Sequence, residues 1–189
     1  MSEAVSALNG ASFEGTVSVR ELGLRGMITV RGNLASTKLK GAVKAAAGAA
    51  APKAGAVALA GEDGVAWMSP DELLVMVPYA EVGERIAAIE DAMAGQHFLA
   101  VNVSDARGVF EIKGAAAREV IAKLCPVDMA PEAFKPGMFR RTRMAQAAAA
   151  FWMVDEETIR VVCFRSVAHY AFGLLADAAE PGGEVGFFG

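Results

Sequence analysis

An internal similarity constrains the fold of this chain more than any other feature of its sequence. Residues 67–72 (Trp-Met-Ser-Pro-Asp-Glu) resemble residues 152–157 (Trp-Met-Val-Asp-Glu-Glu), and a β-rich run and an amphipathic helix pattern follow each segment. Upstream, residues 25–32 resemble residues 107–114, with an Arg-Gly pair at the start and a glycine at the end of both. A chance likeness between two amphipathic patterns is the alternative, and the paired tryptophans weigh against it. We therefore expect two related halves.

Each half reads as two strands, a helix, two strands and a second helix. Ser36 is placed to cap the first helix of the first half. The last helix of each half carries an apolar stripe at helical spacing. The stripe residues are Val82, Ile86, Ile89 and Met93 in the first half, and Val167, Tyr170, Ala171, Leu174, Leu175 and Ala178 in the second.

Four strands and two helical stripes in each half leave apolar faces that two halves can bury against each other. The sequence therefore predicts an α+β fold with antiparallel sheets covered by helices. We expect a single domain over residues 1–189, made of two ββαββα pseudo-repeats at about 15–95 and 97–178, with irregular termini. Residues 49–64, rich in alanine, proline and glycine, and residues 126–137 are expected to be loops.

Composition excludes several classes of protein. With 54% apolar and 21% charged residues the chain is not intrinsically disordered, and a net charge of −4 gives no basic surplus for nucleic acid. Its most apolar stretch, residues 45–60, is interrupted by Gly48, Pro52, Lys53 and Gly55, so no membrane span is expected. The first residues do not read as a signal peptide, so we expect a cytoplasmic protein.

Motifs for nucleotide cofactors are missing, and the single reactive side chains have ordinary explanations. No dinucleotide-binding or triphosphate-binding glycine loop occurs in the sequence. His97 is expected in a loop before a strand, and His169 on the exposed side of the last helix. Cys125 stands where a helix ends, which is the wrong end of the helix dipole for an activated thiol, so a packed structural role is expected. Cys163 is expected in the core, and no metal or catalytic residue is assigned.

Carboxylates cluster at residues 71–72, 90–91 and 155–157. The first and third clusters occupy equivalent turns of the two halves, where polar residues are common. Asp105 lies at a strand junction, matches Gly23 of the first half, and is interpreted as a turn-former. No acid–base pair can be assigned.

Arginines and two aromatic residues are the candidate interface residues. Arg140, Arg141 and Arg143 stand at the head of a predicted strand, where Arg141 and Arg143 share one face and Arg140 takes the other. Arg165 begins the last helix. Arginine is enriched at protein interfaces and binds carboxylates in a bidentate manner, although a solvated basic strand end is the alternative.

Phe187 and Phe188 lie on a glycine-rich tail, where large apolar side chains are expected to dock on something. They complete the candidate interface set.

Several segments together resemble the gamma-subunit family of heterotetrameric sarcosine oxidases, over about residues 15–178. The segments follow the family order, with Ser69 and Leu73 departing from the family's glycine and tryptophan. They are residues 23–33, 67–74 (family pattern W-L-G-P-D-E-W-L), 103–107, 124–129 (C-P-L-D-L), 134–137 with 141–143 (F-x-P-G…R-T-R) and 164–170 (R-S-x-A-x-Y).

The resemblance implies a non-catalytic subunit that stabilises the large alpha subunit, with beta and delta subunits in the same complex. Such complexes oxidise sarcosine to glycine, produce hydrogen peroxide and pass a one-carbon unit to tetrahydrofolate. FAD, FMN and NAD are then carried by other subunits, and this chain is expected to bind no cofactor. The family is similar in fold to the folate-binding domain of aminomethyltransferases.

Two other functions stay open on the sequence. One is a stand-alone folate-binding protein for one-carbon transfer, and the other is a homo-oligomeric scaffold of an unrelated pathway.

Overall fold

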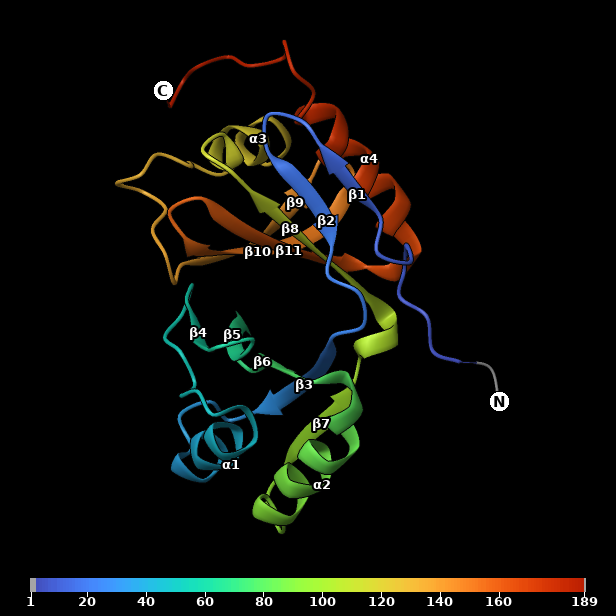
Figure 1. Ribbon diagram of the computed structural model, residues 1–189. Coiled ribbons are helices and arrows are strands. Elements are labelled where there is room, and N and C mark those ends of the chain that lie inside the picture. The colour runs from blue at the N-terminus through green and yellow to red at the C-terminus, as the bar shows by residue number, and fades with distance from the viewer. Residues whose placement is uncertain (1–2, 189) are drawn as a thin grey trace. The chain divides into compact units, whose positions relative to one another are not determined.

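Two separate antiparallel sheets, each with its own pair of helices, make up the structure (Figure 1). The computed structural model describes residues 3–188. Within them, unit 1 comprises residues up to 23 and from 106 onward, and unit 2 comprises residues 24–105. The predicted α+β fold with antiparallel sheets covered by helices is confirmed.

Unit 1 is built on a six-stranded sheet with the order β1-β2-β8-β11-β10-β9. Helices α3 and α4 pack on this sheet, and the core between them contains Phe110, Phe134 and Phe151. The short 3-10 turn Arg165–Val167 leads into α4. The elements are β1 (Ser12–Glu14), β2 (Ser18–Glu21), β8 (Arg107–Lys113), α3 (Ala117–Leu124), β9 (Phe139–Met144), β10 (Ala147–Asp155), β11 (Thr158–Phe164) and α4 (Ala168–Ala178).

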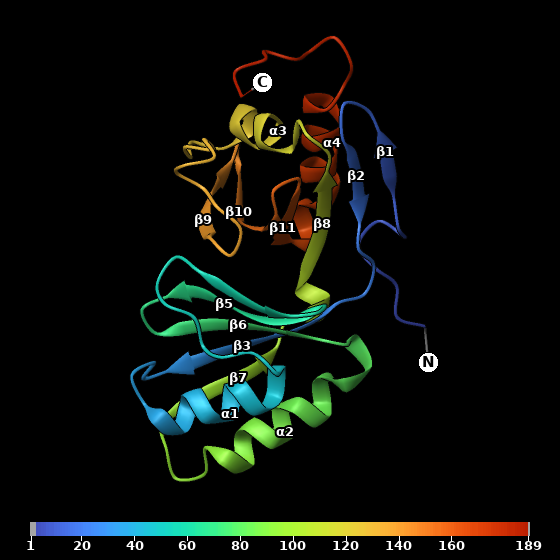
Figure 2. The same cartoon turned by 60° about the vertical axis from the view of Figure 1, so that its left-hand side comes forward.

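Unit 2 is built on a five-stranded sheet with the order β4-β5-β6-β3-β7. Helices α1 and α2 lie side by side on one face of it (Figure 2), over a core that contains Ile28, Leu39 and Leu73. The 3-10 turns are Tyr79–Glu81 and, where the chain leaves the unit, Ser104–Ala106. The elements are β3 (Gly26–Gly32), α1 (Thr37–Ala47), β4 (Val57–Ala60), β5 (Asp63–Ser69), β6 (Glu72–Val77), α2 (Val82–Ala92) and β7 (Phe98–Asn102).

The helices form where the apolar spacing predicts them, with one residue in error. The Ser36 side chain accepts a hydrogen bond from the Leu39 amide at 3.4 Å and caps α1, as predicted. In α4, Ala171 and Leu175 are fully buried, but Tyr170 is 44% exposed, so its assignment to the apolar stripe was wrong. The helix begins at Ala168, whose methyl group takes the buried position in the first turn.

The expected loop over residues 49–64 contains a strand that the sequence analysis missed. Val57–Ala60 forms β4 and pairs with β5 around a two-residue turn, in which Gly61 has a φ of +65°. Two alanines in a strand of four residues give a weak strand signal, because alanine is depleted in strands. Three strands rather than two therefore lie between α1 and α2, and three also lie between α3 and α4.

The first strand of each sequence half pairs within the sheet of the other. From β2 to α2 and from β7 to α4 the elements follow the same order. However, β2 pairs with β8 in unit 1, while β7 pairs with β3 in unit 2. The units are therefore not the two sequence stretches 15–95 and 97–178, and the assignment of those stretches as pseudo-repeats stays a prediction.

Candidate interaction surface

The three neighbouring arginines lie on β9, which is an edge strand of unit 1. Arg141 and Arg143 are exposed on one face of the strand, as the alternation predicts. Arg140 takes the other face, where its guanidinium carbon lies 5.4 Å from the Phe134 ring centroid. Arg143 donates to the Gln146 side chain at 3.0 Å. Both arginines of the exposed pair thus lie on the surface of unit 1, and their expected part in an interface stays a prediction.

Arg165 is used within unit 1. Its guanidinium donates to the carbonyl oxygens of Val5 at 2.9 Å and Ser6 at 3.0 Å. The Glu21 carboxylate holds the same segment, accepting hydrogen bonds from the Ser6 hydroxyl at 2.8 Å and the Gly10 amide at 2.7 Å. Arg165 and Glu21 together hold residues 5–10, and the expected part of Arg165 in an interface stays a prediction.

Residues 184–188 are held against α3 by one carboxylate. Glu119 lies in the first turn of α3 and accepts hydrogen bonds from the Val185 amide at 2.7 Å and the Gly186 amide at 2.9 Å. The hydrogen bond from Val185 is the main cause that lowers the pKa of Glu119 below its usual range. Gly186 has a φ of +67°, a conformation that glycine adopts without strain.

Lys123 extends this contact by one helical turn. Its ammonium group lies 3.1 Å from the Glu119 carboxylate, in the i,i+4 arrangement. The same group donates to the carbonyl oxygens of Ala178 at 3.1 Å and Gly183 at 2.8 Å. The Glu119–Lys123 pair therefore ties α3 both to the end of α4 and to the segment that follows it.

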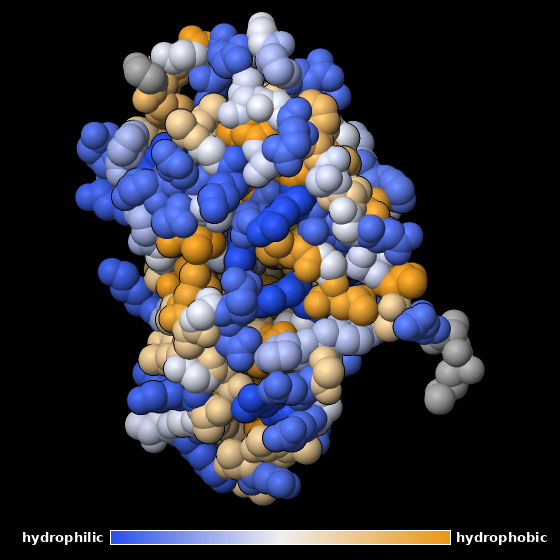
Figure 3. All heavy atoms as spheres, in the orientation of Figure 1, coloured by the Kyte–Doolittle hydropathy of each residue, from blue (hydrophilic) through white to orange (hydrophobic). Residues whose placement is uncertain are grey.

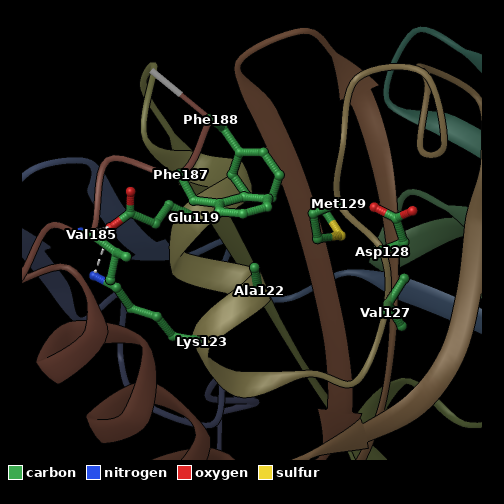
Figure 4. Close-up of a pocket in the computed structure, with 9 residues that line it drawn as sticks. All are labelled: Glu119, Ala122, Lys123, Val127, Asp128, Met129, Val185, Phe187 and Phe188. Carbon is green, nitrogen blue, oxygen red and sulfur yellow. Dashed lines mark hydrogen bonds and ion pairs between the residues drawn. The ribbon is translucent and has the colours of Figure 1, made fainter.

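The two phenylalanines expected to dock behave differently. Phe188 packs against the core of unit 1, whereas Phe187 is 77% exposed. Their ring centroids are 5.0 Å apart with an interplanar angle of 88°. In Figure 4 the two rings border one side of a groove of about 330 Å³, and Met129 and Asp128 stand on the other. The groove is lined by Glu119, Ala122, Lys123, Val127, Asp128, Met129, Val185, Phe187 and Phe188.

Sequence reasoning missed the buried charges of unit 1. Glu111 lies between two arginines, with Arg20 at 2.6 Å and Arg160 at 3.1 Å. Arg118 donates to the carbonyl of Phe134 and pairs with Glu156 at 2.8 Å. A glutamate amid apolar neighbours on β8, and an arginine likewise on β11, were the signals available. Both groups link elements of one unit.

The expected roles of the single reactive residues agree with their places in the fold. Cys125 and Cys163 are buried, and burial raises the pKa of their thiols to about 12 and about 11, which disfavours the reactive thiolate. His97 precedes β7 and His169 lies on the outer side of α4, and both are exposed.

The turn carboxylates also fit their expected roles. Asp71 accepts a hydrogen bond from the Ser69 hydroxyl at 2.6 Å, and Asp155 accepts one from the Glu157 amide at 3.0 Å. The bond from Ser69 is the main cause that lowers the pKa of Asp71. At Asp155 burial acts to raise the pKa, but the hydrogen bonds from Glu157 and Thr158 outweigh it and the pKa is lowered. Asp105 accepts a hydrogen bond from the Tyr79 hydroxyl at 2.8 Å and lies in a turn.

A separate hollow of about 640 Å³ lies in unit 2, beside β3 and β7. Arg31 lies in its wall and pairs with Asp71 at 3.2 Å and with Glu72 at 3.7 Å. His97 and Leu99 also line it. Its one arginine is thus already matched by two carboxylates.

Within residues 3–188 no three histidine, cysteine or acidic side chains gather as metal ligands would. None of the helices in that part of the chain is long and apolar enough to cross a bilayer. Among the candidate interface residues, Arg141 and Arg143 on the edge strand β9 and Phe187 are the exposed ones.

The model of the family described as "Sarcosine oxidase, gamma subunit family" matches residues 31–181. A sarcosine oxidase subunit gamma of Arthrobacter sp. is 30% identical over 93% of this chain and 88% of its own length.

Two solved structures resemble the chain. Heterotetrameric sarcosine oxidase from Corynebacterium sp. U-96 contains a chain that matches with a TM-score of 0.81 and 26% identity, covering 92% of this chain and 90% of that one. The aminomethyltransferase T of the glycine cleavage system from Bartonella henselae matches with a TM-score of 0.58 at 15% identity, covering 82% of this chain and 44% of that one. The second likeness concerns the fold alone.

Proposed function

Because this chain belongs to the sarcosine oxidase gamma subunit family, we propose that it is the non-catalytic gamma subunit of a sarcosine oxidase complex. The complex demethylates sarcosine oxidatively to glycine, with hydrogen peroxide as a product, and transfers the one-carbon unit to tetrahydrofolate. The observation that carries the proposal is the match to a chain of a heterotetrameric sarcosine oxidase along nine-tenths of both chains.

The part of this chain in the complex is structural. Glu111, Arg118 and Glu119 are each engaged in contacts within unit 1, so they serve the fold. Arg141 and Arg143 remain exposed on an edge strand and are suited to bind carboxylates of a partner. The large alpha subunit is the main proposed partner, and the beta and delta subunits complete the complex in the cytoplasm.

The cofactors belong to the other subunits in this proposal. FAD, FMN and NAD are bound there, tetrahydrofolate is used there, and this chain binds none of them. Burial raises the pKa of both thiols, which disfavours the thiolate form and so speaks against thiol chemistry at Cys125 and Cys163.

The test is purification of the tagged chain from its native host. We expect three further subunits to elute with it, together with flavin absorbance and sarcosine-dependent production of hydrogen peroxide. A chain that elutes alone, with the oxidase activity in other fractions, contradicts the proposal. Calorimetric titration of the isolated chain with tetrahydrofolate is the companion measurement, and tight binding there favours the stand-alone folate protein instead.

A further inference from the structure

Phe187 is held in a fixed position but is not buried. Its side chain is 77% exposed, while Val185 and Gly186 just before it are bonded to Glu119 and Phe188 just after it packs on the core. A free segment would let such a side chain fold back on the apolar surface, because burying a phenylalanine gains about 2 kcal/mol. The hydrogen bonds before the ring and the packing of Phe188 after it hold the ring in solvent.

These contacts amount to preorganisation. Two hydrogen bonds to an ionised carboxylate are stronger than neutral ones, and Lys123 fixes that carboxylate from one helical turn away. Lys123 also donates a hydrogen bond to the Gly183 carbonyl, just before the segment 184–188. Ordering before binding removes part of the entropy cost of association, which is where a fixed aromatic side chain gains affinity.

Beside the ring lies an apolar groove with acidic surroundings. Met129 and Val127 supply apolar wall opposite the phenyl rings (Figure 4), and Asp128 lies at its edge. Glu180, shortly after the end of α4, and Glu184, the first residue of the segment 184–188, are both exposed. The one lysine that lines the groove is already paired with Glu119. In the space-filling view, hydrophilic side chains flank the apolar ones over the C-terminal segment (Figure 3).

We propose that residues 184–188 form a preformed hook, in which Glu119 positions Phe187 for insertion into an apolar pocket with a basic rim on the large subunit. The inference rests on the proposed function and adds the contact surface and the chemistry of its receptor. The carboxylates around the hook select a partner with lysines or arginines. A second copy of this chain is disfavoured, because two acidic surroundings would face each other.

The test compares whole complexes purified with single variants of this chain. The variants are Phe187→Ala, which removes the inserted ring, and Glu119→Gln, which removes the positioning charge. Glu90→Gln is the matched control, since it is the same chemical change at a glutamate that is exposed on α2 of unit 2, outside the hook. Mass photometry of diluted complexes gives the concentration at which half of them have lost this chain.

We expect that concentration to rise about 30-fold for Phe187→Ala, the effect of a typical aromatic anchor, and about 10-fold for Glu119→Gln. Glu90→Gln is expected to stay within about twofold of the original chain. Hydrogen exchange on the isolated chains separates the two roles: the Val185 and Gly186 amides lose protection in Glu119→Gln and keep it in Phe187→Ala.

Complexes that assemble normally and dissociate alike with and without the Phe187 ring overturn the hook and leave the proposed function intact. So does a Glu119→Gln chain that loses amide protection without any change in dissociation. An original chain that never joins the oxidase subunits contradicts the proposed function, and the hook with it.

Discussion

Two glutamate side chains of unit 1 hold segments that have little regular structure of their own. Glu21 accepts hydrogen bonds from residues 6–10, including the Leu8 amide at 3.0 Å, and Glu119 accepts them from residues 185 and 186. Ionised carboxylates make such bonds to backbone amides stronger than neutral acceptors would. One carboxylate in each case thus contributes to the order of the segment, together with Arg165 at residues 5 and 6 and with the packing of Phe188.

The attachment of the hook to α3 should depend on pH through Glu119. Its pKa is lowered from 4.5, mainly by the Val185 amide, so the docked state favours the ionised form. The stabilisation is then fully present above pH 4.5 and is lost as the pH falls through the lowered pKa. In an NMR titration the Val185 and Gly186 amide signals are expected to shift with a midpoint below 4.5.

The Glu119→Gln chain is the control for this titration, because it has no carboxylate at that place. Its two amide signals should not follow that transition. A midpoint at or above 4.5 in the original chain would show that the hydrogen bonds do not stabilise the ionised carboxylate.

At the scale of single elements, the glycine of the Arg-Gly pair has different surroundings at the start of β3 (Gly26) and at the start of β8 (Gly108). A methyl group added at Gly26 would meet the Val77 and Pro78 carbonyl oxygens at 2.6 and 2.7 Å. At Gly108 the nearest atom would be the Ala168 Cβ, at 3.3 Å. Backbone oxygens cannot move aside as easily as a side chain, so β3 tolerates less at its first residue.

We therefore expect Gly26→Ala to lower the free energy of unfolding by about 3 kcal/mol and Gly108→Ala by less than about 1 kcal/mol. Urea denaturation followed by circular dichroism measures both. Equal losses at the two sites would mean that the close approach at Gly26 relaxes at no cost.

Elements with strong periodicity could be predicted from the sequence, and short or apolar-poor ones could not. The Ser36 cap, the stripe of α2 and the alternation of β9 all follow from local spacing. β4 escaped because its alanines carry little strand preference. Tyr170 was placed in the α4 stripe by its spacing from Val167, but its polar hydroxyl allows the ring to lie on the outer side of the helix.

At the scale of the whole molecule, the fold depends on contacts between segments that are distant in the sequence. The spacing of apolar residues could not predict these contacts. The local sequence does not show whether β2 pairs with β8 or with β3, because β8 and β3 have similar sequences. The hook has the same difficulty, since Glu119 and Val185 are far apart in the chain. The candidate residues were selected by type, and only the fold separates exposed Arg141 from tethered Arg165.

Assembly of the complex gives a prediction at this scale. Replacing both Arg141 and Arg143 by alanine is expected to raise the half-dissociation concentration of the complex about 10-fold. The reason is that carboxylates of the proposed partner lose two exposed cations. The melting temperature of the isolated chain should stay within about 2 °C, as for most surface substitutions.

Lys40→Ala with Lys44→Ala on α1 is the matched control, since it removes the same charge from an exposed surface of unit 2. Equal weakening by both pairs would show an effect of net charge alone, and unchanged dissociation in the arginine variant would exclude those side chains as contacts.

The exchange of β2 and β7 between the two sheets has a consequence for biosynthesis. Residues 24–105 can close unit 2 as soon as they have left the ribosome, whereas the strands before residue 24 must wait for β8 to emerge. The earliest part of the nascent chain is thus among the last to find its place, and a gene cut between the two similar stretches would yield two fragments that each lack a strand made by the other.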